Sequence, residues 1–421
     1  MNISIENPQS NHNSLSFIIS GDEKEGLDVS IINSLRRILL SEIPTVAFRT
    51  DEGTNLDIKM EVNKTSLHNE FILHRISLIP LYINPKEFNK DLLFHLSVKH
   101  DGHEPFKFIT SEDFDIYPLK ENLDPDIDLS ILDINNYDLK NKLSNTQKNN
   151  LLRPFKDPFT KNDSYVMITE LKNTNTPDTF QELSLYGVPS ISVAKEHARW
   201  QSVSTASYTY VKNDELFKQI ANDKCDINGI TNDEERIKFI DSLELSESER
   251  YYFKDINGEP FKYEFNITSC HYHTSKDLFL LANEIMIQQL KIIKDHLILM
   301  INGEESSILV KTHKNTNGEE AENVYDFIIA EQDDTLGNVL QSHIVKNFIT
   351  EKSIISFCGY KRSHPLEEFI TLTIGVNPQN KAIDGKNDEQ KVTAIVQSLD
   401  NIIEDIIKIY DEIIKIGSRI L

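Results

Sequence analysis

The chain has 421 residues and a formal net charge of −23, because 67 Asp and Glu residues outnumber 44 Lys and Arg residues. This length exceeds what one hydrophobic core usually supports, so we expect two or three folding units. Nucleic-acid binding depends largely on basic side chains that neutralise phosphates, and the acidic balance therefore argues against a main nucleic-acid-binding surface.

Cysteines and apolar runs narrow the class of protein further. No apolar run approaches the roughly 20 residues that a membrane span needs, and the N-terminus lacks the pattern of a signal peptide. Cys225, Cys270 and Cys358 form no Cys-x-x-Cys pair, which argues against a disulfide framework or a zinc ribbon. We expect a soluble protein of a reducing intracellular compartment, without membrane contact.

The first predicted elements are a strand at residues 11–19 and a helix that begins near Asp28 or Ser30. Either side chain can cap free backbone N–H groups. Apolar residues at helical spacing predict one buried stripe, while Arg36 and Arg37 lie on polar faces. Pro44 ends this helix, because proline lacks a backbone donor and restricts the residue before it.

The middle of the chain is less regular. We expect strands at residues 61–65, 164–169 and 207–211, with a short helix around Phe71 and Ile72. Residues 121–150 are rich in Asp, Asn and Lys and are predicted to form a surface insertion. Residues 212–258 are also polar and charged, with few positions suited to a core.

The last third repeats the order strand, helix, strand, long helix. A long amphipathic helix is predicted at residues 275–300 and another at 392–416, and Asn317-Gly318 is a hairpin turn signal. Between them a second short helix echoes the first. Both short helices share Asn-x-Leu-x-x-x-Leu/Ile, at Asn33, Leu35 and Leu39 and at Asn338, Leu340 and Ile344. We expect the two helices to pack against each other, as in an assembly platform.

Candidate metal and catalytic sites are weak. Asp124, Asp126 and Asp128 resemble the start of a calcium loop, but Leu129 stands where Gly is required and Asn135 where Glu belongs. Cys270, His271 and His273 lack a signalled fourth ligand. His197 has no accompanying nucleophile motif, and we find no Gly-rich phosphate loop. We predict no metal, no cofactor and no catalytic residue in this chain.

Several segments resemble, in family order, the alpha-like subunits of cellular RNA polymerases. Residues 33–47, 61–63 with 70–81, 194–200 and the helix from Ser275 resemble the larger alpha-like subunit, the archaeal D or third eukaryotic type. Residues 333–340 and 359–367 resemble the smaller one, the archaeal L or eleventh eukaryotic type. The resemblance leaves out residues 85–160 and 212–258. It implies a fusion of both subunits, similar to the arrangement in nucleocytoplasmic large DNA viruses.

The resemblance implies an α+β fold with two alpha-like dimerisation modules, each an antiparallel sheet with helices on one face. Residues 1–50 and 201–300 would form the larger-subunit-like domain, interrupted by a mainly β insertion domain at residues 51–200. Residues 301–421 would form the smaller-subunit-like domain. Eukaryotic and some archaeal larger subunits hold a cysteine cluster in the insertion that binds zinc or an iron–sulfur cluster, and the scattered cysteines here predict neither.

The short helices are expected to cross and bury one shared core of Ile31, Leu35, Ile38, Leu39, Leu336, Leu340 and Ile344. By resemblance, Arg36 and Arg37 would contact the large polymerase subunits. Lys195, His197, Arg199 and Trp200 would form a docking edge for the second-largest subunit, although local packing is the alternative. Trp200 in particular is as consistent with a core position as with a binding hot spot.

The implied function is a non-catalytic assembly platform of a DNA-directed RNA polymerase. Its expected partners are the largest (beta-prime-like) and second-largest (beta-like) subunits and small zinc-binding subunits, with only indirect contact to DNA. The resemblance implies a place in the host cytoplasm, in a viral factory, and leaves packaging in the virion open. Two rivals remain: a free-standing interaction scaffold that reuses the fold, and an enzyme with an unrecognised site in the insertion.

Overall fold

The computed structural model describes residues 3–11, 13–24, 26–50, 56–119, 141–174, 176, 179–314, 317–350, 353–381 and 383–421. The chain divides into two compact units. Unit 1 comprises residues 1–39, 205–268 and 275–421, and unit 2 comprises residues 40–204 and 269–274. The predicted insertion domain, residues 51–200, thus lies within unit 2. Residues 301–421 belong to the same compact unit as the N-terminal residues.

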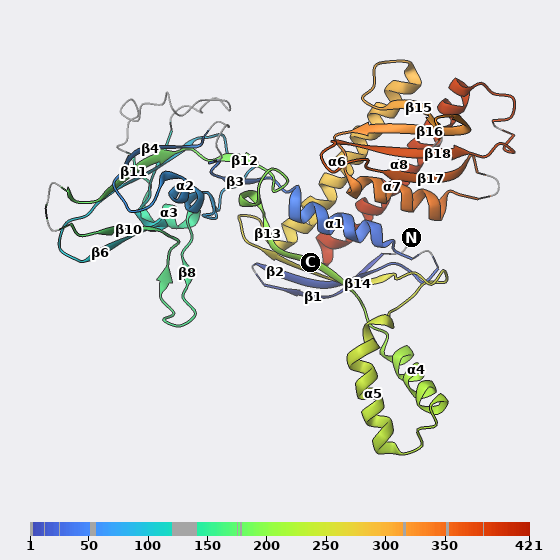
Figure 1. Ribbon diagram of the computed structural model, residues 1–421, viewed down its shortest axis with the longest axis horizontal. Helices are drawn as coiled ribbons and strands as arrows, with labels where there is room; N and C mark the ends of the chain where they lie inside the picture. The colour runs from blue at the N-terminus through green and yellow to red at the C-terminus, as the bar shows by residue number, and fades with distance from the viewer. Residues whose placement is uncertain are drawn as a thin grey trace. The chain divides into compact units, whose positions relative to one another are not determined.

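The first sheet of unit 1 is four-stranded and antiparallel where its pairing is described (Figure 1). Its strands, in spatial order, are β1 (Ser4–Ser10), β2 (Ser14–Ser20), β14 (Lys262–Ser269) and β13 (Val203–Tyr210). Phe17 pairs with Phe265 across β2 and β14, and the Phe17 ring lies 4.9 Å from the ring of Phe279. Because Phe279 belongs to α6 (Ser275–Asn302), this helix covers one face of the sheet.

The second sheet of unit 1 is also four-stranded and antiparallel. Its order is β15 (Leu309–Lys314), β16 (Glu320–Ala330), β18 (Phe369–Val376) and β17 (Ile355–Lys361). Helix α7 (Asp334–Asn347) packs on β17 and β18. Gly337 permits this approach, because a Cβ at that position would lie 2.6 Å from the Tyr360 ring. Each sheet of unit 1 therefore has helices packed against one face.

Two long helices and one short helix complete this core. Helix α8 (Asp388–Ile420) runs against α6 and also contacts α7. Helix α1 (Val29–Ser41) presents a face of buried side chains. The α+β class with antiparallel sheets is as predicted. Among the described helices, none combines the length and apolar character needed to cross a membrane.

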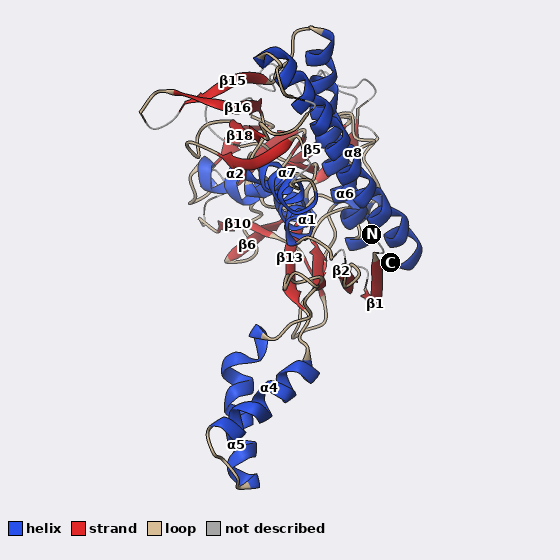
Figure 2. Cartoon of the chain, turned by 90° about the vertical axis from the view of Figure 1, so that its right-hand side faces the viewer, coloured by secondary structure: helices blue, strands red, loops and turns tan. Residues whose placement is uncertain are grey.

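Two helices between β13 and β14 were not predicted. Helix α4 (Asp214–Ile227) and helix α5 (Asp233–Glu247) form a hairpin that extends away from the first sheet (Figure 2). A short 3₁₀ turn, η5 (Ser248–Arg250), follows. The side chains of Asn213 and Asn232 cap the two helices by accepting backbone N–H bonds. These caps were the signals that could have revealed the hairpin in a segment with few core positions.

Unit 2 is mostly β, and its core is one apolar cluster under a four-stranded sheet. That sheet has the order β4 (Ile58–Asn63), β11 (Glu182–Gly187), β5 (Leu92–Lys99) and β7 (Asp115–Pro118). Three two-stranded sheets accompany it: β3 (Thr45–Ala47) with β12 (Ser190–Ser192), β6 (Phe106–Thr110) with β10 (Met167–Lys172), and β8 (Phe155–Lys156) with β9 (Asp163–Ser164).

Short helices join these strands of unit 2. They are α2 (Asn69–Ser77), α3 (Asn145–Leu151) and the 3₁₀ turns η1 (Ser111–Asp113) and η4 (Ala198–Trp200). Helix α3 lies at the end of the segment that was predicted to be a surface insertion. The candidate calcium loop at Asp124, Asp126 and Asp128 lies outside the described residues.

Candidate functional site

The two echoing helices, α1 and α7, run antiparallel and are joined at both ends by polar contacts. At one end, Arg37 Nε donates to Thr335 Oγ1 at 2.8 Å, and Arg37 lies 3.7 Å from the Asp333 carboxylate. At the other end, Ser342 Oγ donates to Asp28 Oδ2 at 2.7 Å. The end of α1 thus contacts the start of α7, and the start of α1 contacts the last part of α7. The two helices therefore lie side by side and run in opposite directions (Figure 1).

The apolar faces of both helices are buried in unit 1. Each of the seven side chains predicted for a shared core is at most 2% exposed: Ile31, Leu35, Ile38, Leu39, Leu336, Leu340 and Ile344. Burial of each large aliphatic side chain stabilises the folded state by roughly 1.5–3 kcal/mol. The helical spacing in the sequence therefore located the buried faces of both helices.

A buried hydrogen bond ties α1 to the last helix. Ser34 Oγ lies 2.7 Å from Tyr410 Oη, and the same Ser34 hydroxyl donates to the Ile31 carbonyl. Since that serine has only one proton, the tyrosine hydroxyl is the donor in the pair. Burial raises the pKa of Tyr410, which keeps this donor protonated.

The long helices α6 and α8 are held together by charge and by close packing. Lys294 on α6 makes an ion pair with Glu404 and lies 3.7 Å from the Asp400 carboxylate. Farther along, Gly417 leaves room for Phe279, whose ring would lie 3.3 Å from an added Cβ. Two helices that are separated in the chain by the whole second sheet thus pack in one layer.

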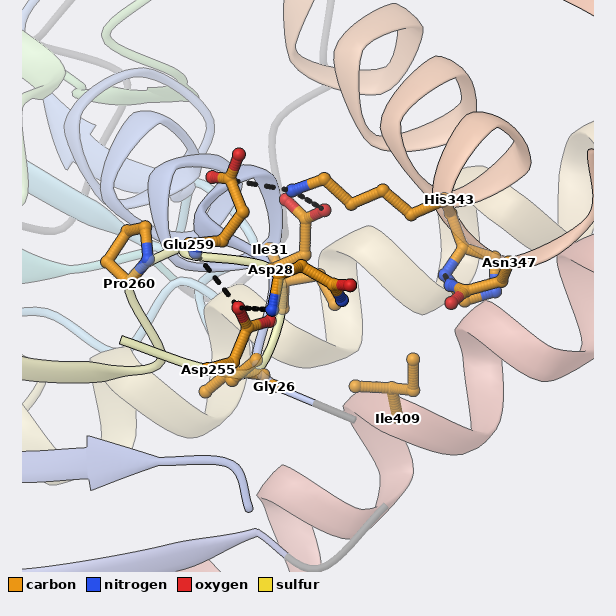
Figure 3. Close-up of a pocket in the computed structure, with 12 residues that line it drawn as sticks. Gly26, Asp28, Ile31, Asp255, Glu259, Pro260, His343, Asn347 and Ile409 are labelled. Atoms are coloured by element: carbon orange, nitrogen blue, oxygen red, sulfur yellow. Dashed lines mark hydrogen bonds and ion pairs between the residues drawn. The ribbon is translucent and has the colours of Figure 1, made fainter. Parts of the chain in front are cut away.

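A polar pocket of about 320 Å³ lies where these segments meet (Figure 3). Its lining includes Asp28, Glu259, His343 and Lys346. Lys346 Nζ lies 2.9 Å from Asp28 and 3.9 Å from Glu259. Burial alone would raise the pKa of Asp28, but the bonds from Ser342, the Ser30 N–H and Lys346 lower it below its ordinary value.

His343 stands against this pocket as a neutral side chain. Its Nδ1 accepts from the Asn347 amide at 3.0 Å, so the ring proton lies on Nε2, which is buried and has no partner among the described residues. Burial lowers the pKa of His343. The pocket is therefore polar, and two of its acidic groups, Asp28 and Glu259, are paired to one lysine.

The two adjacent arginines of α1 have different surroundings. Arg37 is engaged with α7 through Thr335 and Asp333, inside unit 1. Arg36 is half-buried, and its Nε donates to Asn33 Oδ1 at 2.9 Å within the same helix. The contact of both arginines with other subunits stays a prediction: the Arg37 guanidinium already binds within the chain, but its side chain remains 39% exposed.

The expected docking edge in unit 2 requires a correction. Trp200 is fully buried and Arg199 is 3% exposed, so neither side chain is available to a partner on this surface. Arg199 donates to the Phe48 carbonyl at 3.0 Å and to Thr50 Oγ1 at 2.8 Å. The structure therefore favours the alternative given from the sequence, in which these two residues serve local packing. Lys195 is exposed and His197 half-buried, and both remain at the surface.

Two residues near this edge were not singled out from the sequence. Arg49 makes a two-pronged ion pair with Glu196 at 3.0 and 3.1 Å and lies 5.3 Å from the Trp200 ring. Asp57 accepts bonds from the Arg49 N–H and Ser190 Oγ, yet burial raises its pKa to about 6. Glu196 and Ser190 are distant in sequence from Arg49 and Asp57, so the local sequence pattern could not predict these contacts.

The candidate metal residues do not form a ligand set. Burial raises the pKa of the Cys270 thiol to about 11, and this thiol donates to the Gln201 carbonyl. Burial lowers the pKa of His271. Within the described ranges, no group of three or more His, Cys, Asp or Glu side chains is placed to hold a metal ion.

Unit 1 contains two four-stranded sheets, and each has helices packed against it. This arrangement is that of a protein with two similar α+β modules. The chain belongs to the RNA polymerase Rpb3/Rpb11 dimerisation domain family, whose model matches residues 23–290. A second model of the same description matches residues 325–415. Two such domains therefore occur in one chain, as the resemblance of its segments predicted.

Curated relatives agree with this membership. The chain is 27% identical over 220 residues to the DNA-directed RNA polymerases IV and V subunit 3B of Arabidopsis thaliana, covering 51% of this chain and 58% of the relative. It is 30% identical over 207 residues to the DNA-directed RNA polymerases I and III subunit rpac1 of Dictyostelium discoideum, covering 48% and 52%.

An archaeal protein shows the same likeness. The DNA-directed RNA polymerase subunit Rpo3 of Methanosphaera stadtmanae is 24% identical over 212 residues, covering 47% of this chain and 60% of the relative. The chain thus spans between about half and three-fifths of the length of these relatives. All three relatives are named as subunits of polymerases.

Proposed function

We propose that this chain is a non-catalytic assembly subunit of a DNA-directed RNA polymerase, with both alpha-like partners in one polypeptide. The observation that carries the proposal is the antiparallel pairing of α1 with α7, since these helices come from the two matched family domains. Pairing two domains within one chain replaces a bimolecular step by an intramolecular one, at an effective concentration on the order of millimolar.

The seven buried side chains of α1 and α7 are proposed to form the dimerisation interface of this platform. Their burial supports that role, because a shared apolar face is what holds two such modules together. Tyr410 and Lys294 would add directional contacts between the halves through α8 and α6. The platform would then present its outer surface to the large subunits.

We propose that the largest and second-largest polymerase subunits dock on exposed or half-exposed basic residues, namely Arg36, Lys195 and His197. Basic side chains stand out on a chain of net charge −23, and charge complementarity sets the register of an interface more than its total affinity. Small zinc-binding subunits would complete the assembly, and DNA would be contacted only through the large subunits.

The presence of two family domains in one chain also suggests in which kind of polymerase the chain works. The fused arrangement, which is similar to that of nucleocytoplasmic large DNA viruses, supports a viral polymerase that works in the host cytoplasm. The test is to express the tagged chain in its natural setting and to measure which proteins co-purify in stoichiometric amounts. Two very large polypeptides in a one-to-one ratio with this chain are expected.

The same purification separates the rival functions. A free-standing scaffold would co-purify with other proteins while the two large subunits are absent, and this result would overturn the proposal. Nucleotide-dependent RNA synthesis should follow the whole complex and should be lost when the large subunits are stripped away. Retention of activity by the isolated chain would instead identify an enzyme.

A further inference from the structure

The hairpin of α4 and α5 carries large side chains that are not buried against the rest of unit 1. In α4, Phe217, Ala221 and Cys225 recur every four residues and are buried. In α5, by contrast, no residue is buried. Arg236, Phe239, Ile240 and Leu243 are only half-buried, at the spacing of a face turned toward α4.

The opposite face of α5 is exposed and mixes charged side chains, Glu234 and Lys238 among them, with two large apolar ones. Ile237 and Leu245 lie eight residues apart on one stripe and are 60% and 92% exposed. Asp241 lies between them on the same stripe. Single exposed apolar residues are common on protein surfaces; here two of them share one stripe of a projecting helix.

Acidic side chains surround this stripe. Asp241 and Glu244 are exposed and make no ion pair with any described residue, and their neighbours Glu247 and Glu249 are each paired with a lysine. The four carboxylates and Leu245 line an open groove of about 780 Å³ at the base of the hairpin, where Lys212 and Arg250 are the two basic lining residues. This distribution repels nucleic acid, whose phosphates require basic partners.

We propose that the outer face of α5 is a docking site for a basic polypeptide segment with apolar anchors. Ile237 and Leu245 would contact the apolar side chains of that segment, and Asp241 and Glu244 would pair with its Lys or Arg residues. The partner's chemistry follows from charge complementarity, because unpaired carboxylates flank the apolar stripe. This inference does not depend on the proposed polymerase role.

The hairpin is built to hold such a surface rigidly. Glu247 forms an ion pair with Lys224 and accepts from Tyr251 Oη at 3.2 Å, while Arg236 pairs with Asp226 at 2.6 Å. The two ion pairs join α4 to α5, and their residues on α5, Arg236 and Glu247, belong to the half-buried face turned toward α4. A partner therefore meets a preformed face, which lowers the entropy cost of binding.

The test uses the full chain and a fluorescein-labelled amphipathic peptide made only of lysine and leucine. Binding is measured by fluorescence anisotropy at near-physiological salt. We expect Ile237→Ser and Leu245→Ser each to weaken binding several-fold, and Asp241→Lys with Glu244→Lys to weaken it at least tenfold. A lysine–serine peptide of equal length and charge should bind at least tenfold more weakly than the leucine peptide.

Matched variants separate this site from general attraction to an acidic protein. Leu366 is 85% exposed, and Glu319 and Glu322 are exposed residues around the β15–β16 turn. We expect Leu366→Ser, and Glu319→Lys with Glu322→Lys, to leave peptide binding unchanged. Equal losses in these variants, unchanged binding in the α5 variants, or tighter binding of a labelled RNA than of the peptide would each overturn the proposal.

Discussion

Ser34 and Tyr410 are 376 positions apart in the chain and share a buried hydrogen bond of 2.7 Å. The serine lies on α1, at the start of the first family domain, and the tyrosine lies on α8, at the end of the second. Since both side chains are at most 1% exposed, this bond forms only when the two halves of unit 1 pack together. It is therefore a direct probe of that packing.

Removing the tyrosine hydroxyl should lower the stability of unit 1. We expect Tyr410→Phe to cost about 1 kcal/mol, because one buried hydrogen bond is lost while Ser34 keeps its bond to Ile31. Ser34→Ala should cost more, about 1–3 kcal/mol, since it leaves the Tyr410 hydroxyl buried without an acceptor. Urea unfolding followed by circular dichroism measures both, with the partly exposed Tyr210→Phe as a control. Wild-type stability in Tyr410→Phe would contradict the bond.

Asp28 should make unit 1 sensitive to acid. Its folded-state pKa lies below the ordinary value, so its contribution to stability is present above about pH 4 and is lost as the pH falls through the folded-state pKa. Asp28→Asn removes the ion pair with Lys346 and should cost about 1.5–3 kcal/mol at neutral pH. It should also flatten the acid limb of the pH–stability curve, whereas Asp411→Asn, at an exposed position of α8, should not.

Asp57 in unit 2 should show the opposite dependence. Burial raises its folded-state pKa to about 6, so its protonated form is favoured in the folded state. Its contribution is most favourable below about pH 4 and declines as the pH rises toward 6. We expect Asp57→Asn to remove this decline and to raise the free energy of unfolding at pH 7 by up to about 2 kcal/mol.

Trp200 allows this experiment to be read from unit 2 alone. It is the single tryptophan of the chain and is fully buried in unit 2, so its fluorescence reports on the unfolding of that unit. Glu104→Gln, at an exposed position, serves as the matched control. A stability of Asp57→Asn that still declines between pH 4 and 6 would mean that another group titrates.

The difference between what the sequence predicted and what it missed has a physical basis. Leu35 and Leu340 were placed in a buried face because helical periodicity is a local signal. Trp200 and Arg199 were assigned to a docking edge by resemblance, and their burial could not be predicted because it depends on residues such as Phe48, which are distant in sequence. Arg36 and Arg37 are adjacent and chemically identical, so only the position of Thr335 distinguishes their roles.

A charge in the buried face of α1 should prevent assembly. Leu35 is fully buried, and Leu35→Asp would place an unpaired carboxylate in an apolar environment, at a cost of several kcal/mol. We expect this variant to lose the cooperative unfolding of unit 1 and to fail to co-purify with large polymerase subunits. Leu35→Met should do neither, because methionine nearly conserves volume and polarity. Normal incorporation of Leu35→Asp would show that α1 is not part of the interface.

The two arginines of α1 allow docking to be separated from folding. Arg37→Ala breaks the contacts with Thr335 and Asp333, so we expect unit 1 to lose about 1 kcal/mol. Arg36→Ala removes only a bond within the helix and should change stability by less than about 0.5 kcal/mol. If Arg36 docks a large subunit, its variant should still reduce co-purification of that subunit at unchanged stability. Full recovery of the complex with Arg36→Ala would assign that arginine to a solvated face, leaving Lys195 and His197 as the docking candidates.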